Sequence, residues 1–269
     1  MGSFKCRLCG SDNLSLYSTH GNAHEYKYYR CPDCGLVNYD MSSGLDQGKY
    51  GVEFVDPRES HKSNEIKTQT YRFIKKRIPS RGRLLDIGCG SGRLLYLARE
   101  DGWDVSGFEL SPYLAGCLGE KLGIGVKVGN FLEDDLGEEK GRYDLVTLIH
   151  VLEHLPDPLL AMSRIGELLK PEGCAVLEFP NITGLDPRIK RLMRRAGVYK
   201  KKYPPGWVPG HCNEYCEESF RFLARKTGFE IEVWQTYSSK ASLNTLYNAF
   251  KWGNKARVLI RKTRREGTV

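Results

Sequence analysis

The chain has 269 residues, 40% of them hydrophobic and 28% charged, which is the composition of a globular protein. No apolar run approaches the roughly 18 residues that a membrane span requires, so the composition excludes a protein built from membrane-spanning helices. The formal charge of +8 is concentrated in two basic segments, 188–202 and 251–269, so the remainder is mildly acidic and the pattern predicts an anionic partner.

Four cysteines near the N-terminus form two pairs with Cys-x-x-Cys spacing. The first pair is CRLC at 6–9, the second is CPDC at 31–34, and a strand-like segment, EYKYYR, lies between them. Four thiolates at this spacing are typical of a tetrahedral structural zinc site, whereas a redox pair normally opens a helix in a βαβ unit. We therefore predict a small β zinc ribbon over residues 1–40. Its zinc ligands would be Cys6, Cys9, Cys31 and Cys34.

The N-terminal segment MGSFKCRLCG contains no apolar signal region, so we expect a cytoplasmic protein. Nine cysteines in such a protein favour metal binding or redox chemistry over a disulfide framework.

Residues 41–80 predict a linker that is followed by a helix from Ile66 to Ile78. Beyond them, strand-like and helix-like segments alternate. The predicted strands are 83–87, 104–108, 125–128, 143–149, 174–179 and 229–235, and the predicted helices are 92–101, 111–122, 157–169 and 216–227. Strict alternation predicts a parallel sheet covered on both faces, which is an α/β, Rossmann-like doubly wound fold over residues 81–269.

The C-terminal part adds a helix-like stretch at 242–250 and an apolar run at 256–262. We predict that this run forms the last strand, although the charges around it also suit a membrane contact.

A glycine-rich turn, DIGCGSGR, follows the strand predicted at 83–87 and is typical of a nucleotide site. Its glycines, Gly88, Gly90 and Gly92, have the spacing G-x-G-x-G and not the G-x-G-x-x-G of dinucleotide sites. A dinucleotide brings a pyrophosphate that needs the positive end of a helix. S-adenosylmethionine has no phosphate and needs close backbone approach and a nearby carboxylate.

Two acidic residues fit that cofactor. Asp86, at the start of the turn, is placed to supply a carboxylate to the ammonium group of S-adenosylmethionine. Glu109 ends the next strand and is placed to accept hydrogen bonds from two ribose hydroxyls, a role that suits both cofactors.

Four segments decide between the cofactors because they occur together and in order: LLDIGCGSGRLL, VSGFELSP, VGNFLEDDL and YDLVTLIHVLEHLPDP. In this order they resemble the class I S-adenosylmethionine-dependent methyltransferases, in the branch that contains the quinone-biosynthesis O-methyltransferases. The resemblance covers about residues 66–180. The alternative is a sheet without cofactor, in which the glycines only allow a tight turn.

The resemblance implies S-adenosylmethionine as the cofactor and assigns its site residues. Gly88, Cys89 and Gly90 would line the methionine portion, Glu109 would bind the ribose, Leu110 would cover one adenine face, and Asn130 with Phe131 would contact the adenine edge. Many relatives have Asp where this chain has Asn130, but either side chain can accept the adenine amino hydrogen.

A zinc ribbon ahead of such a domain is similar to the arrangement in bacterial sugar C-methyltransferases. One family of ribosomal RNA guanine methyltransferases also carries an N-terminal zinc module.

Three histidines are candidates for the catalytic base, because an oxygen or carbon nucleophile must lose a proton during methyl transfer. His150 ends the fourth strand and His154 follows four residues later, so a helical turn would place them on one face. The alternative for both is a structural or cofactor-lining role, and we include His150 among the cofactor-binding residues. In the quinone O-methyltransferases an acidic and histidine cluster here can hold a divalent ion, which implicates Glu153 and His154. Two ligands are too few to predict a metal.

The third candidate, His211, lies in the segment PPGWVPGHCNEYC, within a lid insertion that we predict at about 181–215. Three aromatic residues of this segment and its surroundings offer flat faces suited to a sugar or an aromatic ring: Tyr203, Trp207 and Tyr215. The cysteines beside His211, Cys212 and Cys216, are interpreted as ordinary thiols because no second knuckle completes a metal site.

The segment DPRIKRLMRRAG, which overlaps the basic segment 188–202, predicts an amphipathic, cationic helix. Ile189, Leu192, Met193 and Ala196 share one face, and the basic residues take the other. One interpretation is a lid helix that packs its apolar stripe on the domain. A second is a peripheral membrane contact, on the inner membrane face, that gives access to a lipid-linked substrate. Nucleic-acid binding is the least favoured, because no RNA module is recognised.

We therefore expect an S-adenosylmethionine-dependent methyltransferase with a structural zinc. The predicted acceptor is an oxygen or carbon of a small-molecule or lipid-linked anionic substrate, with a sugar or polysaccharide precursor favoured. The alternatives are a zinc-ribbon RNA methyltransferase and a non-catalytic cofactor-binding module.

Overall fold

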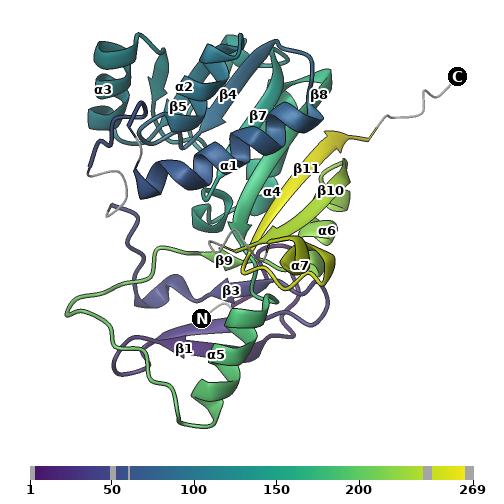
Figure 1. The fold of residues 1–269 in the computed structure, drawn as a ribbon. Coiled ribbons are helices and arrows are strands. Elements are labelled where there is room, and N and C mark those ends of the chain that lie inside the picture. The colour runs from purple at the N-terminus through teal and green to yellow at the C-terminus, as the bar shows by residue number, and fades with distance from the viewer. Residues whose placement is uncertain (1–3, 49–52, 60, 239–243, 264–269) are drawn as a thin grey trace, which may run out of the picture.

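The computed structural model describes residues 4–48, 53–59, 61–238 and 244–263. It contains two sheets: a large one of seven strands in the order β10-β11-β8-β7-β4-β5-β6, and a small one of four strands in the order β1-β2-β3-β9 (Figure 1). The elements are β1 (Ser15–His20), β2 (Tyr26–Arg30), β3 (Val37–Tyr39), η1 (Met41–Ser43), α1 (Lys62–Arg77), β4 (Arg83–Ile87), α2 (Arg93–Glu100), β5 (Asp104–Glu109), α3 (Pro112–Leu122), β6 (Val126–Val128), η2 (Gly137–Glu139), β7 (Tyr143–Ile149), η3 (Leu152–His154), α4 (Pro158–Leu168), β8 (Leu169–Pro180), α5 (Leu185–Arg195), β9 (Asn213–Glu214), α6 (Glu217–Lys226), β10 (Phe229–Tyr237), α7 (Asn244–Ala249) and β11 (Lys255–Lys262).

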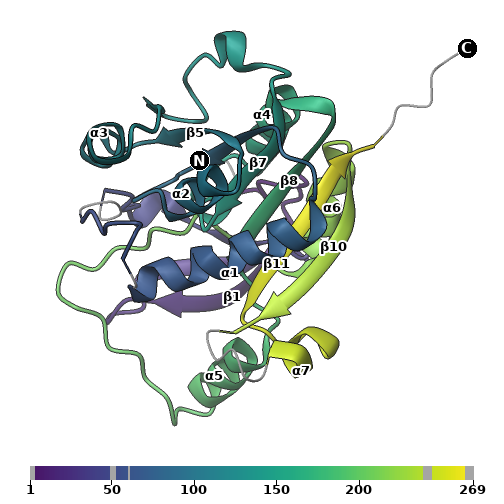
Figure 2. The ribbon, with the colours of Figure 1, turned by 45° about the horizontal axis from the view of Figure 1, so that its top comes forward.

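Helices cover both faces of the large sheet, so the predicted Rossmann-like α/β class is confirmed. Buried side chains of α1, α2 and α3 pack on one face, and those of α4 and α6 pack on the other. Figure 2 shows α1 lying across its face of the sheet. Within the ranges given above, no helix is long and apolar enough to cross a bilayer.

The predicted strands and helices agree with the structure to within about two residues over most of the sheet, but the sheet is mixed and not all parallel. β11 runs antiparallel to both β8 and β10 and lies between them. The reason is the connection: α7 is a short helix between β10 and β11, so the chain turns back into the sheet without a crossover. The start of the helix predicted at 242–250 lies outside the described residues, as does the end of the basic C-terminal segment.

The small sheet combines three strands from the N-terminal segment with one strand from much later in the chain. β1, β2 and β3 pair in antiparallel order within the predicted ribbon, and β9 then pairs with β3. β9 comes from residues 213–214, inside the segment that we predicted as a lid insertion. The N-terminal sheet is therefore completed by a strand that belongs to the second half of the chain.

A buried polar network fixes α1 to the C-terminal edge strands. Glu178 on β8 is fully buried and accepts hydrogen bonds from the hydroxyls of Thr70 (2.6 Å) and Tyr237 (2.5 Å), and it pairs with the buried Arg257. A buried carboxylate is tolerated only when its charge and lone pairs are satisfied in this way. The network positions α1, which carries Lys67 toward the glycine-rich turn.

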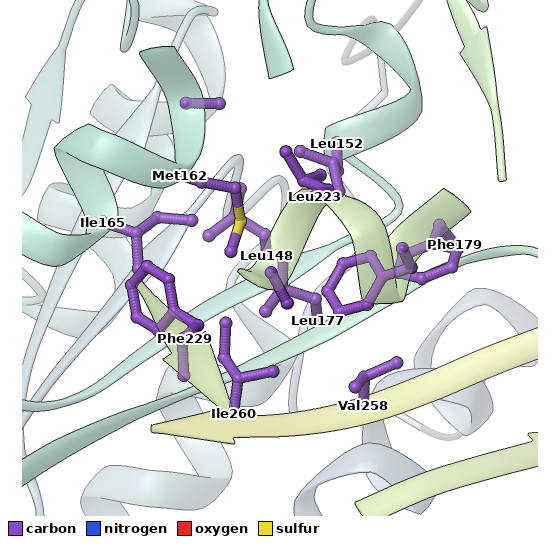
Figure 3. Close-up of a cluster of buried hydrophobic side chains, with 14 of the residues drawn as sticks. Leu148, Leu152, Met162, Ile165, Leu177, Phe179, Leu223, Phe229, Val258 and Ile260 are labelled. Carbon is purple, nitrogen blue, oxygen red and sulfur yellow. The ribbon is translucent and has the colours of Figure 1, made fainter. Parts of the chain in front are cut away.

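Apolar side chains from β7, β8, β11, α4 and α6 meet in one core cluster (Figure 3). Leu177, at the centre of β8, is fully buried in it. Leu160 of α4 is 40% exposed and lies outside it.

We expect Leu177→Ala to lower the free energy of unfolding by about 2–5 kcal/mol, because a cavity would remain where the side chain was. The same change at Leu160 should cost about 0.5 kcal/mol or less. Urea unfolding of both variants, followed by circular dichroism, tests this difference. Equal losses would mean that Leu177 is not in the core.

Candidate active site

A cavity of about 510 Å³ opens at the edge of the large sheet where the parallel strands β4, β5 and β7 end. Ligands of doubly wound sheets bind at this edge. Its walls are formed by Gln47, Gly48, Ile87, Gly88, Gly90, Phe108, Glu109, Leu110, Ser111, Leu114, Gly129, Asn130, Phe131, His150, Val151, His154 and Leu155.

The glycine-rich turn forms the floor of the cavity. Gly88, Gly90 and Gly92 all have positive φ angles, and a Cβ atom at Gly88 would lie 2.5 Å from a methyl carbon of Val151. Only glycine adopts this backbone without strain. Gly88 and Gly90 line the cavity, but Gly92 instead caps α2 under Leu118.

Cys89 was expected to line the methionine portion, and the structure places its side chain elsewhere. The thiol is fully buried beneath the turn, where a Cβ on Gly107 of β5 would come within 2.9 Å of the sulfur. Burial raises the pKa of this thiol, so it stays protonated. Cys89 therefore shapes the turn from below and is not among the lining residues.

Glu109 is held by two backbone donors at the end of β5. One carboxylate oxygen accepts from the N–H of Gly90 (2.8 Å) and the other from the N–H of Ser111 (3.0 Å). The side chain is 9% exposed and lines the cavity. A carboxylate oriented in this way still has lone pairs for two hydroxyls, as the predicted ribose contact requires.

The residues predicted around the adenine lie together at the far end of the cavity. Leu110 is 59% exposed there, and Phe131 packs edge-on against Phe108 with ring centres 6.0 Å apart. The side-chain oxygen of Asn130 accepts from the N–H of Leu132 (3.0 Å). That oxygen has a second lone pair, so the predicted contact with the adenine amino group is compatible with this arrangement.

Asp86 lies behind the glycine turn and not in the cavity wall. It is fully buried, and one oxygen accepts from the hydroxyl of Thr147 (2.6 Å) while the other has no hydrogen-bond partner among the described residues. Burial raises the pKa of Asp86, although the charge of Lys67 and the bond from Thr147 act against that rise. Asp86 does not line the cavity, so its contact with the ammonium group of S-adenosylmethionine stays a prediction.

Lys67 is a residue that the sequence analysis missed. Its ammonium group donates to the carbonyl of Cys89 (2.8 Å) and lies 3.6 Å from where a Cβ of Gly90 would be. It thus places a positive charge beside the floor of the cavity, where a cofactor carboxylate could pair with it. Gln47 and Gly48 were missed as well, because they belong to a linker without periodic pattern.

His150 and Glu153 form a hydrogen-bonded pair at the end of β7. His150 has a φ of 59°, which is uncommon for a residue with a side chain and is found at functional sites. Its Nδ1 lies 3.2 Å from a carboxylate oxygen of Glu153, which is 1% exposed. Burial alone would raise the pKa of Glu153, but the bond from His150 and the neighbouring histidine charges keep that pKa below its usual value.

His154 and His211 complete the group. The turn at 152–154 is a 3₁₀ turn, and it places His150 and His154 together in the cavity wall as predicted from their spacing. His211 reaches them from the distant segment, with its ring centre 4.7 Å from that of His154. We define the histidine cluster as His150, Glu153, His154 and His211.

Three members of the histidine cluster can also be tested as a metal site, as the quinone O-methyltransferases suggest. Ligand atoms of Glu153, His154 and His211 lie within 4.8 Å of one another. The second oxygen of Glu153 is buried with no hydrogen-bond partner in the described part of the chain. His154 Nδ1 lies 2.8 Å from the Gly210 carbonyl, and this bond would turn Nε2 toward an ion. The donor set fits a divalent cation that accepts nitrogen and oxygen ligands.

The lid aromatics are not acceptor-binding faces in this structure. Tyr215 is fully buried against Phe179, and Tyr203 and Trp207 pack on His20 and on each other over the small sheet. None of the three lines the cavity. The prediction that they hold a sugar or aromatic ring is therefore wrong, because Tyr215 belongs to the core of the large sheet and the other two rings pack over the small sheet.

The four N-terminal cysteines come together as predicted. Cys6 and Cys34 have their sulfurs 3.5 Å apart, Cys9 and Cys31 have theirs 3.4 Å apart, and all four lie within 4.8 Å of one another. Zinc–sulfur bonds of about 2.3 Å in a tetrahedron separate the sulfurs by roughly 3.8 Å. The cluster thus has the dimensions of a structural zinc site, and zinc stays our prediction for it.

The turn between Cys6 and Cys9 also contacts the segment that carries His211. Arg7, between Cys6 and Cys9, donates to the carbonyls of Tyr39 (2.6 Å) and Cys212 (3.1 Å). Arg7 therefore clamps β3 to the residue that follows His211. The residue two places further, Glu214, pairs with Val37 of β3.

A second set of bonds joins the same segment to the turn that carries Glu153 and His154. The N–H of Cys212 donates to the carbonyl of Glu153 (2.8 Å), its thiol donates to the carbonyl of His154 (3.2 Å), and the amide of Asn213 donates to the carbonyl of Leu155 (2.8 Å). Cys212 thus holds the segment of His211 against the turn of Glu153 and His154 by hydrogen bonds. Cys216 is buried at the start of α6, beside Ser219.

Comparison with known proteins decides the family. Residues 59–233, more than half of the chain, match the family described as Methyltransferase domain. A relative from Thiobacillus denitrificans, named ubiquinone biosynthesis O-methyltransferase, is 32% identical over 212 residues, which are 73% of this chain and 86% of that protein. The chain belongs to the methyltransferase family. The prediction of an S-adenosylmethionine-dependent enzyme is thereby confirmed. The alternative of a non-catalytic cofactor-binding module finds no support in these relatives.

Other relatives of this methyltransferase match over shorter stretches. A protein of the same name from Xylella fastidiosa is 37% identical over 106 residues, which are 38% of this chain and 43% of that protein. The chain spans about half the length of the first curated relatives it matches.

Solved structures confirm the methyltransferase fold. The PH0226 protein from Pyrococcus horikoshii matches with a TM-score of 0.56 and 18% identity, over 78% of this chain and 95% of that one. Magnesium protoporphyrin IX methyltransferase from Synechocystis, with bound SAH, matches with a TM-score of 0.54 and 16% identity, over 75% and 84% of the two chains. At these identities the likeness concerns the fold alone.

We expect Glu109→Gln to weaken S-adenosylmethionine binding about tenfold to a hundredfold, because the ribose would lose acceptors and the turn would lose its charged partner. Isothermal titration calorimetry measures this change. Glu100→Gln, on the exposed end of α2, is the matched control and should bind normally. Unchanged affinity in Glu109→Gln would show that the ribose lies elsewhere.

We expect the purified methyltransferase to contain one zinc per chain, held by the four N-terminal cysteines. Cys31→Ser should lose the metal and lower the melting temperature, because the small sheet has little core of its own. Cys117→Ser, a cysteine of α3 outside the cluster, should keep the metal. Metal analysis by plasma mass spectrometry measures both. A stable, zinc-free wild type would rule out the ribbon.

Proposed function

We propose that this methyltransferase transfers the methyl group to a hydroxyl oxygen of its acceptor, with His150 as the general base. The observation that carries the proposal is the pair of His150 with the buried carboxylate of Glu153. His150 of this pair lies in the wall of the cavity that the glycine-rich turn floors, and Glu153 lies buried behind it. The names of the relatives, which are O-methyltransferases, support transfer to oxygen.

The geometry of the pair suits proton removal. Glu153 stays ionised, so it holds Nδ1 of His150 protonated and leaves Nε2 as the acceptor. Nε2 is buried and has no hydrogen-bond partner within the described ranges, and the His150 side chain, 28% exposed, lines the cavity beside it. A hydroxyl placed against Nε2 gives up its proton there, and the carboxylate of Glu153 stabilises the resulting imidazolium.

Bound S-adenosylmethionine supplies a methyl group on a positively charged sulfur. Transfer would leave the carbon–sulfur bonding electrons on the sulfur of S-adenosylhomocysteine, and the hydroxyl proton would end on His150. Lys67 would pair with the carboxylate of the cofactor and Glu109 would bind its ribose, so these two residues would fix the cofactor's position relative to His150.

His154 and His211 serve the acceptor side of this site. If a divalent cation is bound there, Glu153, His154 and His211 would hold it, and it would polarise the acceptor oxygen and ease loss of its proton. Without an ion, the same two histidines would orient the hydroxyl by hydrogen bonds.

This proposal restricts the acceptor atom to a hydroxyl oxygen, whereas the sequence analysis allowed an oxygen or a carbon. The sugar or polysaccharide precursor favoured there finds no support in the names of the relatives reported above. It also loses the three aromatic residues that were expected to bind it.

The test of the proposal is methyl transfer from labelled S-adenosylmethionine to three acceptor sets: phenols of quinone pathways, nucleotide sugars and total RNA. Mass spectrometry of the labelled product locates the methyl group. We expect an O-methyl ether of a small hydroxyl compound. Label on carbon, or label only in RNA, would contradict the proposal.

We expect His150→Gln to lower kcat on the identified acceptor at least about a hundredfold, because the general base is removed. The affinity for S-adenosylhomocysteine should change little. His24→Gln, on an exposed turn of the small sheet, is the control and should keep full turnover. If His150→Gln also keeps full turnover, the base lies elsewhere.

A further inference from the structure

Helix α5 is attached to the protein by its polar face. Arg191 donates a hydrogen bond to the hydroxyl of Tyr17 on β1, and its guanidinium lies 4.8 Å from the centre of the Tyr17 ring. Arg194 is also only half exposed and lies over Tyr199. Arg191 and Arg194 are three residues apart, so the helix turns a cationic face inward.

The apolar stripe of α5 points away from the protein. Ile189 is 47% exposed, Leu192 is 69% exposed and Met193 is 38% exposed, and no side chain of the helix is buried. The first interpretation of this helix, that its apolar stripe packs on the domain, is therefore wrong. Arg191 and its neighbours take the place on the small sheet that the stripe would have needed.

A second exposed apolar group lies next to α5. Figures 1 and 2 both show α7 beside it, and the N–H of Leu185 at the start of α5 donates to the carbonyl of Trp252 (2.8 Å). Leu246 is 54% exposed, and Phe250 (58%) stacks on Trp252 (41%) with ring centres 4.7 Å apart. Exposed apolar side chains gathered in this way mark interaction sites in soluble proteins.

Basic residues surround these apolar groups. The segment 188–202 contains eight Lys and Arg residues and no acid, and Lys251 lies between Phe250 and Trp252 in the sequence. We name the surface formed by α5, residues 196–202, α7 and residues 250–252 the docking surface.

We propose that the docking surface binds the headgroup region of a lipid bilayer that carries net negative charge. Its apolar side chains would enter the boundary between headgroups and acyl chains. The basic residues that face solvent, such as Arg188, Arg195 and Lys200, would contact the phosphates, whereas Arg191 is bonded to Tyr17 and Lys251 to Glu217.

Charge complementarity selects this occupant: the cations alone would suit any polyanion, but the exposed Leu192 and the Phe250–Trp252 pair gain only where apolar surface is offered. RNA bases can stack on the aromatic pair, but they offer no match for the exposed aliphatic stripe of Ile189, Leu192 and Met193, so the pattern favours lipid.

The proposal is independent of the methyl acceptor, because binding to a bilayer can be measured without turnover. It has one consequence for the site. Residues 196–210 connect α5 directly to His211, so an enzyme docked in this way would hold its histidine cluster within one loop of the membrane surface.

The test is flotation of the full-length protein with two kinds of vesicle, phosphatidylcholine alone and phosphatidylcholine with about one third phosphatidylglycerol. We expect binding only to the anionic vesicles, and weaker binding as salt rises from about 0.05 to about 0.5 M, because the Debye length falls from above about 10 Å to well below it and the phosphate contacts are screened.

The decisive variant is Leu192→Asp, which should weaken anionic-vesicle binding about tenfold or more, because an apolar contact is lost and a like charge is added. The matched control is Leu160→Asp, the same change at an exposed leucine of α4, which should bind vesicles normally. Both variants should bind S-adenosylhomocysteine as the wild type does, which shows that they are folded.

Three outcomes would overturn the proposal. The wild type fails to float with anionic vesicles, or both Asp variants lose binding equally, which would indicate a charge effect without a defined surface. In the third outcome, total RNA competes with the vesicles for the protein, and Leu192→Asp changes neither vesicle binding nor RNA binding. The surface would then be a nucleic-acid site.

Discussion

The pairing of β9 with β3 is the constraint on which the acceptor side of this enzyme depends. β9 consists of two residues, 213–214, and it directly follows His211 and Cys212. On one side it pairs with the N-terminal sheet, and Arg7 of the cysteine knuckle reinforces that pairing. On the other side the same residues bond the backbone of the turn that carries Glu153 and His154. A bridge between Asn181 and Tyr215 ties the same segment to the end of β8, and β9 adds the link to the N-terminal sheet.

The site accordingly has two halves with different origins. The cofactor half is made by consecutive strand ends of the large sheet, with the glycine-rich turn and Glu109 as its fixed parts. The acceptor half is made by three segments that are far apart in the sequence, residues 47–48, 150–155 and 211–213. Methyl transfer needs a rigid arrangement of donor and nucleophile. The small sheet therefore contributes to catalysis by holding the acceptor half in place, although none of its cysteines touches the cavity.

The sequence was informative where structure is local. Periodicity located most strands of the large sheet to within about two residues, because central strands such as β4 and β7 are buried on both faces and read as continuous apolar runs. β8 is the exception, since it begins at Leu169 and was predicted from 174. Motif spacing located Gly88, Gly90, Glu109 and the four cysteines, because these positions need particular backbone angles or ligands. His150 and His154 were found in the same way, from their place after a strand.

Long-range pairing could not be read from the sequence. β9 is too short to show a period, and Lys67 and Gln47 carry no pattern that separates them from other polar residues. The helix at 185–195 shows why a sequence pattern does not reveal long-range contacts. Its period identified which residues share a face, but not which way that face points. The direction is decided by Arg191 and Tyr17, which are 174 residues apart. For the same reason the rings of Tyr203 and Trp207 were assigned to an acceptor, when their partners lie in the N-terminal sheet.

The central claim, that the N-terminal module holds the acceptor half of the site, is tested most directly by hydrogen–deuterium exchange of Arg7→Met. Arg30→Met is the matched control, because Arg30 also joins the small sheet to the later chain, through an exposed pair with Glu218. Our account predicts faster exchange at residues 211–214 and 152–155 in Arg7→Met only, with exchange at 84–92 unchanged. Equal protection of 211–214 in Arg7→Met and the wild type would contradict it, and would mean that the histidine cluster is held by the methyltransferase sheet alone.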